Sequence, residues 1–342
     1  QKMEGKKKKK KIHWWLIILI IILLLLLSVT AAAYMIFKNY HDKSNYVKDE
    51  DIPIISSLPE TEAAEGETPE ETLDPEVASS LESQIEEEVQ QIETPTSETV
   101  YNVLLIGSDR RDASWYGNSD SMILASVNES TKTIHLTSFM RDLYAVIPGF
   151  GAQKLNAAYA HGAGPLLVQT IEENFKIDIN NYASVDFNSM ATIIDMIGGV
   201  NLDIYQEEAD YLNSSIGTSF SAGNVHMNGT EAVAYSRIRY VGKYDYERTS
   251  RQRRVLEQIF LQAKTMSLTQ LNDFANAVLP YITHNLSETD LLSKIAKIPE
   301  WIQYDLVMDR VPYDGLYSNL GEQLVPDYPA TIERLHNNIY GG

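Results

Sequence analysis

The sequence contains no cysteine, which excludes disulfides, thiol catalysis and cysteine-ligated zinc or iron–sulfur sites. It also lacks the standard phosphate and metal motifs, since GxxxxGK[ST], HExxH and GxSxG do not occur. Basic residues are few, with 28 Lys and Arg against 47 Asp and Glu. The resulting net charge of −19 argues against non-specific binding of nucleic acid.

The charge is distributed unevenly along the chain. Residues 1–40 hold eight Lys and Arg against one acid, and residues 41–100 hold two Lys against eighteen acids. Residues 101–342 carry a net charge of −10. This distribution predicts a basic tail, an acidic segment and a mildly acidic domain. The last part, about 240 residues long, is long enough to bury a large core as one domain.

One long apolar run stands near the N-terminus. Trp14–Phe37 has 24 residues without a charge, and about 20 apolar residues suffice to cross the hydrocarbon core of a membrane. The basic run Lys6–Lys11 comes before it. By the positive-inside rule, residues 1–13 form a cytoplasmic basic tail and residues 14–37 a single transmembrane helix, so that the rest of the chain lies outside the cell membrane. A cleaved signal peptide is the alternative, but the run is longer than the apolar region of a typical signal peptide.

Residues 38–99 are rich in Glu, Ser, Thr and Pro. Such a composition cannot bury enough apolar surface to offset the entropy of ordering, so we predict an acidic disordered linker. Leu81–Ile92 is the one candidate for a short exposed helix within it. Residues 100–342 then form the extracytoplasmic domain.

Apolar patterns in that domain alternate between the periods of strands and helices. Short apolar runs predict strands at Tyr101–Ile106, Ser121–Val127 and Thr133–Ser138, and alternation predicts another at Val200–Ile204. Helical stripes are predicted over residues 165–175, 187–197 and 255–263. Strands mixed with helices of this length predict a layered α/β domain with helices packed on a central sheet.

Two acidic residues stand where neighbouring strands end and begin. Asp109 lies just beyond the strand predicted at Tyr101–Ile106, and Asp120 lies just before the one predicted at Ser121–Val127. A loop that joins such neighbours brings both carboxylates together. Two carboxylates with room for water and phosphate oxygens suit Mg²⁺. Acids are common in loops, however, so a solvated loop is the alternative interpretation.

The segment SRIRYVGKYDYERTSRQRR, Ser236–Arg254, holds seven Lys and Arg within nineteen residues. Arg237 and Arg239 share one face if this part is a strand. Arg248 and Gln252 are four apart and share one face of a helix. The planar guanidinium group suits bidentate contacts with phosphate, so two such pairs would form a phosphate pocket. A cationic face that pairs with the domain's own acids is the alternative.

Several motifs taken together resemble the LytR–CpsA–Psr family of bacterial cell-wall enzymes. NVLLIGSD, SDSM, SFMRD, KLNAAY, VDFNSMATIIDMIGGVNLDI, MNGTEAVAYSRIRY and DYERTSRQRR occur in the family's order, over roughly Tyr101–Gln262. The resemblance implies a three-layer α/β/α sandwich around a central mixed sheet, with an apolar cleft for a polyprenyl tail. It also implies a phosphotransferase that moves a glycopolymer, such as wall teichoic acid or a capsular or secondary wall polysaccharide, from undecaprenyl pyrophosphate. The acceptor would be a muramic acid hydroxyl of peptidoglycan, and the product a phosphodiester.

The resemblance implies a role for each motif residue. Asp109 and Asp120 would hold Mg²⁺, or Mn²⁺ in its place. The catalytic set would comprise these two with Arg141, Arg237 and Arg239. The pyrophosphate would be bound by Arg141, Lys154, Arg237, Arg239, Asp245, Arg248 and Gln252.

Charge neutralisation and alignment matter more than covalent catalysis when a pyrophosphate bond is broken, and such a pocket supplies both. Two rival functions keep the same pocket. A non-catalytic module would bind polyprenyl-phosphate lipids without metal chemistry, and a lipid-pyrophosphate hydrolase would release the polymer to water. A domain outside the membrane has no nucleic-acid partner.

Overall fold

The computed structural model describes residues 38, 42–58, 73–110, 115–239, 241–242 and 245–341. The chain divides into two compact units, residues 1–43 and Ser44–Gly342, and the second contains the elements that follow. The predicted basic tail and transmembrane helix lie outside the described residues. Within the described part of the chain, no helix combines the length and the apolar character that a membrane span needs.

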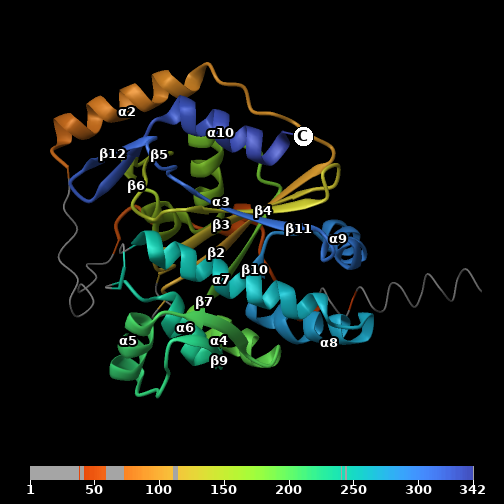
Figure 1. Ribbon diagram of the computed structural model, residues 1–342. Coiled ribbons are helices and arrows are strands. Elements are labelled where there is room, and N and C mark those ends of the chain that lie inside the picture. Colours follow the sequence, from red (N-terminus) through yellow and green to blue (C-terminus); the bar gives the residue numbers. More distant parts are fainter. Residues whose placement is uncertain are drawn as a thin grey trace, which may run out of the picture. The chain divides into compact units, whose positions relative to one another are not determined.

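A seven-stranded sheet forms the centre of the Ser44–Gly342 unit (Figure 1). Its strand order is β1–β10–β7–β2–β3–β4–β11. The central strands β2, β3 and β4 are antiparallel, whereas β7 is parallel to β2 and β11 is parallel to β4. The sheet is therefore mixed, and its strands are β1 (Asn45–Tyr46), β2 (Val100–Ser108), β3 (Ser119–Asn128), β4 (Thr133–Phe139), β7 (Asn181–Asp186), β10 (Thr283–His284) and β11 (Asp305–Val311).

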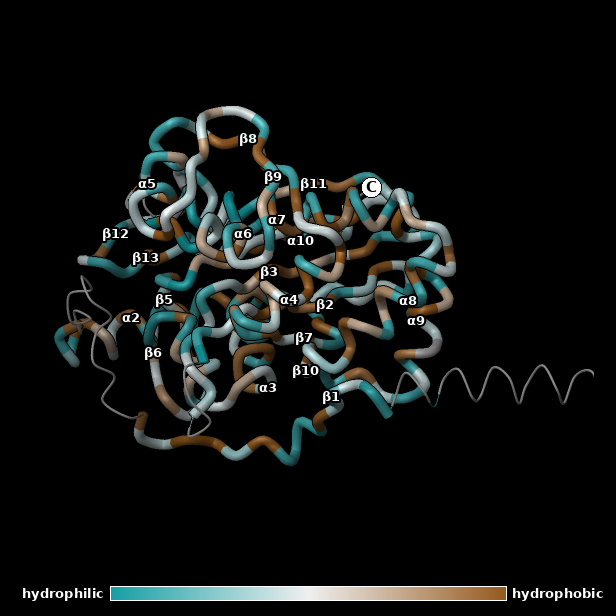
Figure 2. Tube along the Cα trace, turned by 90° about the horizontal axis from the view of Figure 1, so that it is seen from below, coloured by the Kyte–Doolittle hydropathy of each residue, from teal (hydrophilic) through white to brown (hydrophobic). Residues whose placement is uncertain are grey.

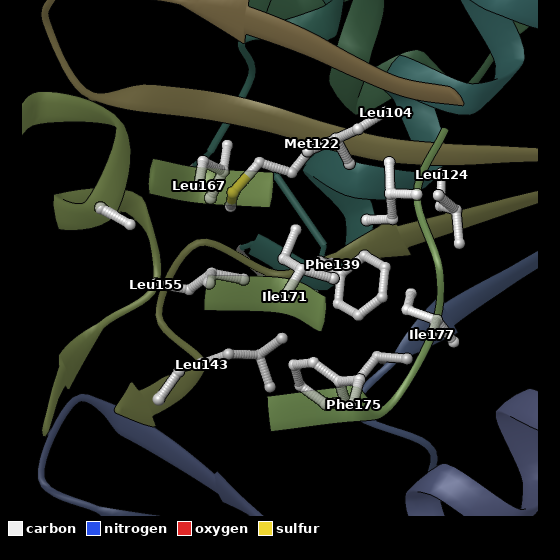
Figure 3. Packing of buried hydrophobic residues seen from close by; sticks show 14 of the residues in the cluster. Leu104, Met122, Leu124, Phe139, Leu143, Leu155, Leu167, Ile171, Phe175 and Ile177 are labelled. Carbon is white, nitrogen blue, oxygen red and sulfur yellow. The ribbon is translucent and has the colours of Figure 1, made fainter. Parts of the chain in front are cut away.

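Helices cover both faces of the sheet. Successive side chains of a strand point to opposite faces, so each face presents apolar side chains that helices bury. Leu104 and Met122 pack into a large core with α3 (Asn156–Phe175) and α10 (Tyr328–Tyr340), as Figure 3 shows for Leu104, Met122 and the α3 residues. Ile123 belongs to a second core, which includes residues of α7 (Asp245–Lys264) on the other face. Burying each such apolar side chain contributes about 1.5–3 kcal/mol. The predicted layered α/β domain is confirmed.

The remaining elements flank these layers. The helical stripes predicted at 187–197 and 255–263 fall in α4 and α7, and the stripe at 165–175 is the second half of α3. In α3 the helical geometry breaks at Gly162 and Ala163, just before Pro165. The other elements are α4 (Phe187–Met196), α5 (Gln206–Ile216), α6 (Gly229–Ser236), α8 (Leu268–Val278), α9 (Glu288–Trp301), β5 (Tyr144–Ile147), β6 (Gly151–Lys154), β8 (Val200–Ile204), β9 (Gly223–Met227), β12 (Tyr317–Leu320), β13 (Gln323–Pro326) and the 3₁₀ turns Asp49–Asp51 and Leu279–Tyr281.

Two parts of the predicted disordered linker are ordered and packed on the domain. The helix α2 (Pro75–Gln90) is capped by Asp74, whose side chain accepts a hydrogen bond from the Glu76 N–H at 2.9 Å. Its Ile85 and Val89, one turn apart, are buried in the same core as α3 and α10. The prediction of disorder was wrong here because the acidic composition of the whole segment hides this short apolar stripe.

The other ordered part is an N-terminal strap, residues 44–58. Its β1 adds a parallel strand to β10, and the Val47 N–H donates to the His284 carbonyl at 2.9 Å. Further along, the Ile55 N–H donates to the His161 carbonyl at 2.7 Å, and the His161 ring lies 2.8 Å from the Ile55 carbonyl. These backbone contacts are made without buried apolar runs, so the sequence pattern gives no sign of them.

Candidate active site

The two predicted carboxylates lie at one end of the β2–β3 hairpin. Gly107 pairs with Ser121 and Ser108 pairs with Ser119, so Asp120 is the extra residue of a β-bulge. Bulges redirect a side chain at the edge of a regular ladder. Asp120 is therefore set apart from the regular alternation of β3.

Asp109 follows β2 directly, and its N–H donates to the Asn118 carbonyl at 3.0 Å. Gly117 makes this close approach possible, because it has φ +78° and a Cβ there would lie 2.7 Å from the Asp109 carbonyl oxygen. The hairpin thus brings Asp109 and Asp120 to the same end of the sheet, as the sequence predicts.

Asp120 lies between two arginines. Its Oδ1 is 3.3 Å from Nη1 of Arg141, which follows β4, and 3.7 Å from Nη1 of Arg248 on α7. Gln252, one turn further along α7, donates from Nε2 to the backbone carbonyl of Asp120 at 3.1 Å. The predicted helical face of Arg248 and Gln252 is confirmed, and only 3% of the Arg248 side chain is exposed.

A second carboxylate extends this ionic network. Asp142 lies 3.5 Å from Nε of Arg141 and 3.3 Å from Nζ of Lys154, which ends β6. Lys154 also lies 3.2 Å from Oε2 of Glu322, in the turn between β12 and β13. Asp142 and Glu322 are not among the sequence-predicted site residues. Asp142 follows Arg141 in the SFMRD motif, and this position could have indicated that it belongs to the site. No feature of the sequence indicates this for Glu322.

Of the other predicted arginines, Arg237 lies beside Asp109. Arg237 Nη2 is 3.8 Å from Asp109 Oδ2, and the guanidinium carbon lies 4.2 Å from the centre of the Phe187 ring. Arg237 ends α6 in helical geometry, and Arg239 lies in the irregular segment that follows. Residues 237–239 do not form the strand on which the two arginines would share one face, because α6 runs to Ser236. Asp245 begins α7.

Three cations of the predicted cluster serve the fold instead. Arg253 donates from Nη1 to Ser138 Oγ of β4 at 2.7 Å, and burial, with nearby Arg310, lowers its pKa to about 10. Arg251 and Arg254 likewise bind protein atoms of neighbouring elements. The alternative of pairing with the domain's own acids is correct for Arg251, whose Nε contacts Glu208. Arg253 and Arg254 bind hydroxyl and carbonyl oxygens instead.

An apolar cavity of about 280 Å³ lies between the sheet and α4, α6, α7 and α8; Figure 2 shows β2, β7, α4 and α8 next to one another. Phe187, which stacks under Arg237, lines it, and so does Gln252, which contacts Asp120. The cavity therefore adjoins both ionic clusters. Its apolar lining includes Leu105, Ile106, Ile123, Val185, Met190, Ile193, Val233, Val255, Leu256, Ile259, Phe274, Val278 and Ile282.

The donor set suits a hydrated hard cation. Among the residues that the structure describes, no group of three or more His, Cys, Asp or Glu side chains is arranged to hold a metal ion. Mg²⁺ is commonly bound by one or two carboxylates, with waters and substrate phosphates completing the shell. Asp109 and Asp120 fit that pattern, since they supply two carboxylates at one end of the hairpin.

Known proteins resemble this chain in sequence and fold. The model of the LytR_cpsA_psr family matches residues 70–331. A protein of Enterococcus faecalis named polyisoprenyl-teichoic acid–peptidoglycan teichoic acid transferase TagU is 35% identical over 224 residues, which cover 63% of this chain and 69% of that protein.

Two solved structures share the α/β fold with its central mixed sheet. TagT bound to LI-WTA aligns with a TM-score of 0.59 and 24% identity over 71% of this chain and 91% of that one. The LytR-CPS2A-psr family protein YwtF (TagT), with bound octaprenyl pyrophosphate lipid, aligns with a TM-score of 0.55 and 22% identity over 73% of this chain and 94% of that one.

Proposed function

This chain belongs to the LytR_cpsA_psr family, and from that premise we propose that it is a glycopolymer phosphotransferase. It transfers wall teichoic acid, or a capsular or secondary wall polysaccharide, from undecaprenyl pyrophosphate to a muramic acid hydroxyl of peptidoglycan. The transferase named for the Enterococcus faecalis relative supports the reaction class. The octaprenyl pyrophosphate in the YwtF structure supports the lipid carrier.

The observation that carries this proposal is the shared boundary between the apolar cavity and the ionic clusters. A polyprenyl pyrophosphate joins a long hydrocarbon chain to a compact charged group. Each buried CH₂ group contributes about 0.8 kcal/mol, so the part of the chain that enters the cavity would contribute to binding. Gln252 and Phe187 stand at the boundary, so the head group of a lipid in this cavity would meet Arg248 and Arg237.

In the reaction, the acceptor hydroxyl oxygen attacks the phosphorus that carries the glycopolymer. The bond from that phosphorus to the bridging oxygen breaks, undecaprenyl phosphate leaves with the electron pair, and the hydroxyl proton passes to solvent. Arg141 and Arg248 neutralise the charge that moves during this step. Because Asp120 and Asp142 already orient Arg141, little reorganisation is needed in the transition state.

We further propose that Asp109 and Asp120 hold Mg²⁺ or Mn²⁺. When bound, the ion supplies positive charge to the phosphate oxygens of the leaving group. We also propose that Lys154, Arg239 and Asp245 line the pyrophosphate site. Residues 14–37 anchor the chain in the cell membrane, with the catalytic domain outside, where peptidoglycan lies.

The test uses the full chain in detergent, an undecaprenyl-pyrophosphate-linked polymer and peptidoglycan fragments. We expect release of undecaprenyl phosphate together with a phosphodiester-linked product, both dependent on the fragments. Release without fragments would identify a hydrolase. Tight binding of the lipid without any turnover would identify a lipid-binding module, and either result would overturn the transferase proposal.

A further inference from the structure

A buried ion pair outside the site holds the segment that carries two of its arginines. Arg251 Nε lies 2.6 Å from Oε1 of Glu208 on α5, and the two side chains are 2% and 1% exposed. Breaking such a buried pair is costly because one charge is left without its partner. Glu208 is itself fixed, since its Oε2 accepts the N–H of Tyr205 at 2.9 Å.

The rest of the Arg251 guanidinium binds the backbone after α6. Nη1 donates to the Ile238 carbonyl and Nη2 donates to the Val241 carbonyl, both at 3.0 Å. Ile238 stands between Arg237 and Arg239. Arg251 therefore contacts the chain beside the predicted phosphate arginines without being one of them.

Ile238 is held in three ways. Its side chain is fully buried in the core of α5, α6 and β8, its N–H donates to the Tyr235 carbonyl at 3.2 Å, and its carbonyl accepts from Arg251. Without the hydrogen bond from Arg251, the peptide group between Ile238 and Arg239 is free to rotate. The 45% exposure of the Arg237 side chain means that packing alone does not fix that neighbour.

We propose that Arg251, held by Glu208, is a positioning residue that presents Arg237 and Arg239 to the pyrophosphate. This inference rests on the proposed function for its ligand. It assigns a role to a cation of the basic segment that contacts neither the carboxylates of the site nor the cavity. The fork geometry of arginine suits this role, because a lysine has one nitrogen and cannot contact Glu208 and both carbonyls in these directions.

A purely structural role for Arg251 makes a different prediction from a positioning role. The variant Arg251→Met alone leaves Glu208 charged and buried, so its loss of stability would mask any other effect. The double variant Arg251→Met/Glu208→Gln removes both charges, and the amide oxygen introduced by Glu208→Gln can still accept the Tyr205 N–H. Removing both charges of a buried pair avoids the cost of leaving one of them unpaired.

The experiment compares the full-length wild type, this double variant, Arg251→Lys and the control Arg254→Met in detergent. Arg254 lies on the same helix and binds the Tyr235 hydroxyl and the Asp203 carbonyl instead. The readouts are the melting temperature, the Kd for octaprenyl pyrophosphate and hydrogen exchange of residues 236–242. We expect the melting temperature of the double variant to be close to that of the wild type. Its Kd should be about tenfold higher, because the ligand would lose about one charge-assisted hydrogen bond.

Exchange in residues 236–242 should become faster in the double variant and stay slow in the control, and Arg251→Lys should bind with intermediate affinity. If residues 236–242 exchange as slowly in the double variant as in the wild type, the positioning role is overturned whatever the binding result. Faster exchange with wild-type affinity overturns it as well. Absence of binding by the wild type would instead count against the proposed function, and the exchange data would still decide whether Arg251 holds this segment.

Discussion

Lys154 Nζ lies 3.2 Å from Oε2 of Glu322, although 168 residues separate them along the chain. The strand β13, which follows the turn with Glu322, is docked through its backbone as well, since the Leu324 N–H donates to the Asp142 carbonyl at 2.9 Å. The hairpin of β12 and β13 therefore closes one side of the ionic network. Through Glu322, the C-terminal part of the chain contributes a carboxylate to the site.

Removing the Glu322 carboxylate should strengthen anion binding. Its side chain is 48% exposed, and it competes with a phosphate for the Lys154 ammonium group. Exposed ion pairs are weak, so we expect Glu322→Gln to lower the Kd for octaprenyl pyrophosphate by about twofold to fivefold. Titration calorimetry measures this change. Lys154→Met is the opposite control and should raise the Kd, whereas weaker binding by Glu322→Gln would contradict a competing role.

Asp120→Asn should abolish most turnover while preserving the lipid site. The change removes the negative charge between Arg141 and Arg248 and one of the two proposed metal-binding carboxylates, so we expect kcat to fall by about 10²- to 10³-fold. Undecaprenyl phosphate release measures turnover, and a Mg²⁺ titration should give a higher half-saturating concentration. Asp314→Asn, which removes an exposed partner of Arg310, is the matched control. Wild-type turnover by Asp120→Asn would refute the assignment.

Filling the apolar cavity should affect the lipid tail and not the head group. Ile259 on α7 lines the cavity, whereas Leu261 on the same helix is exposed and does not. We expect Ile259→Trp to raise the Kd for octaprenyl pyrophosphate by at least about tenfold, because several buried CH₂ groups lose their place. Binding of inorganic pyrophosphate should not change.

Leu261→Trp is the matched control and should bind both ligands as the wild type does. Equal weakening of lipid and inorganic pyrophosphate by Ile259→Trp would mean that the substitution disturbs the ionic clusters, and the cavity would lose its assignment to the tail.

Stability should fall in mild acid through His336. Burial lowers its pKa, and its Nε2 lies 2.7 Å from the Lys176 carbonyl. In the unfolded chain the His336 ring has its ordinary pKa of about 6.5, so below this pH it takes up a proton more readily than in the folded protein. The folded state therefore loses stability as the pH falls from about 6.5 towards 5. His336→Gln keeps an N–H donor without a titrating ring.

We expect the melting temperature of His336→Gln to fall less than that of the wild type between pH 7 and pH 5. The pKa of His135 is lowered by burial too, so part of the acid sensitivity should remain. His226→Gln, which replaces an exposed ring on β9, should follow the wild-type curve. An unchanged slope in His336→Gln would show that this ring is not responsible.

The sequence predicts those parts of the site that depend on regular geometry. Asp109 and Asp120 follow from the ends of two adjacent strands, and Arg248 and Gln252 follow from the helical repeat. The sequence leaves the conformation at Arg237 open, because an alternating pattern of three residues does not distinguish a strand from the end of a helix. Tertiary contact decides that point, through the burial of Ile238 against α5 and β8.

Other features depend on contacts that no local pattern records. Glu322 reaches the site only because β11 and the following hairpin fold back beside β4 and β5. The separation of the basic segment into site cations and fold-supporting cations is equally non-local. Arg251 and Arg248 look alike in the sequence, but one is bound by Glu208 and the other by Asp120.

The strap, residues 44–58, covers the edge of the sheet at β10. The two residues of β1 give β10 a neighbour on one side, while β7 occupies the other. A shortened chain that starts at residue 73 would leave the outward amides and carbonyls of Thr283 and His284 open to solvent or to a second molecule. Exposed strand edges of this kind favour edge-to-edge association, so such a fragment should self-associate more readily than a chain that keeps residues 44–58.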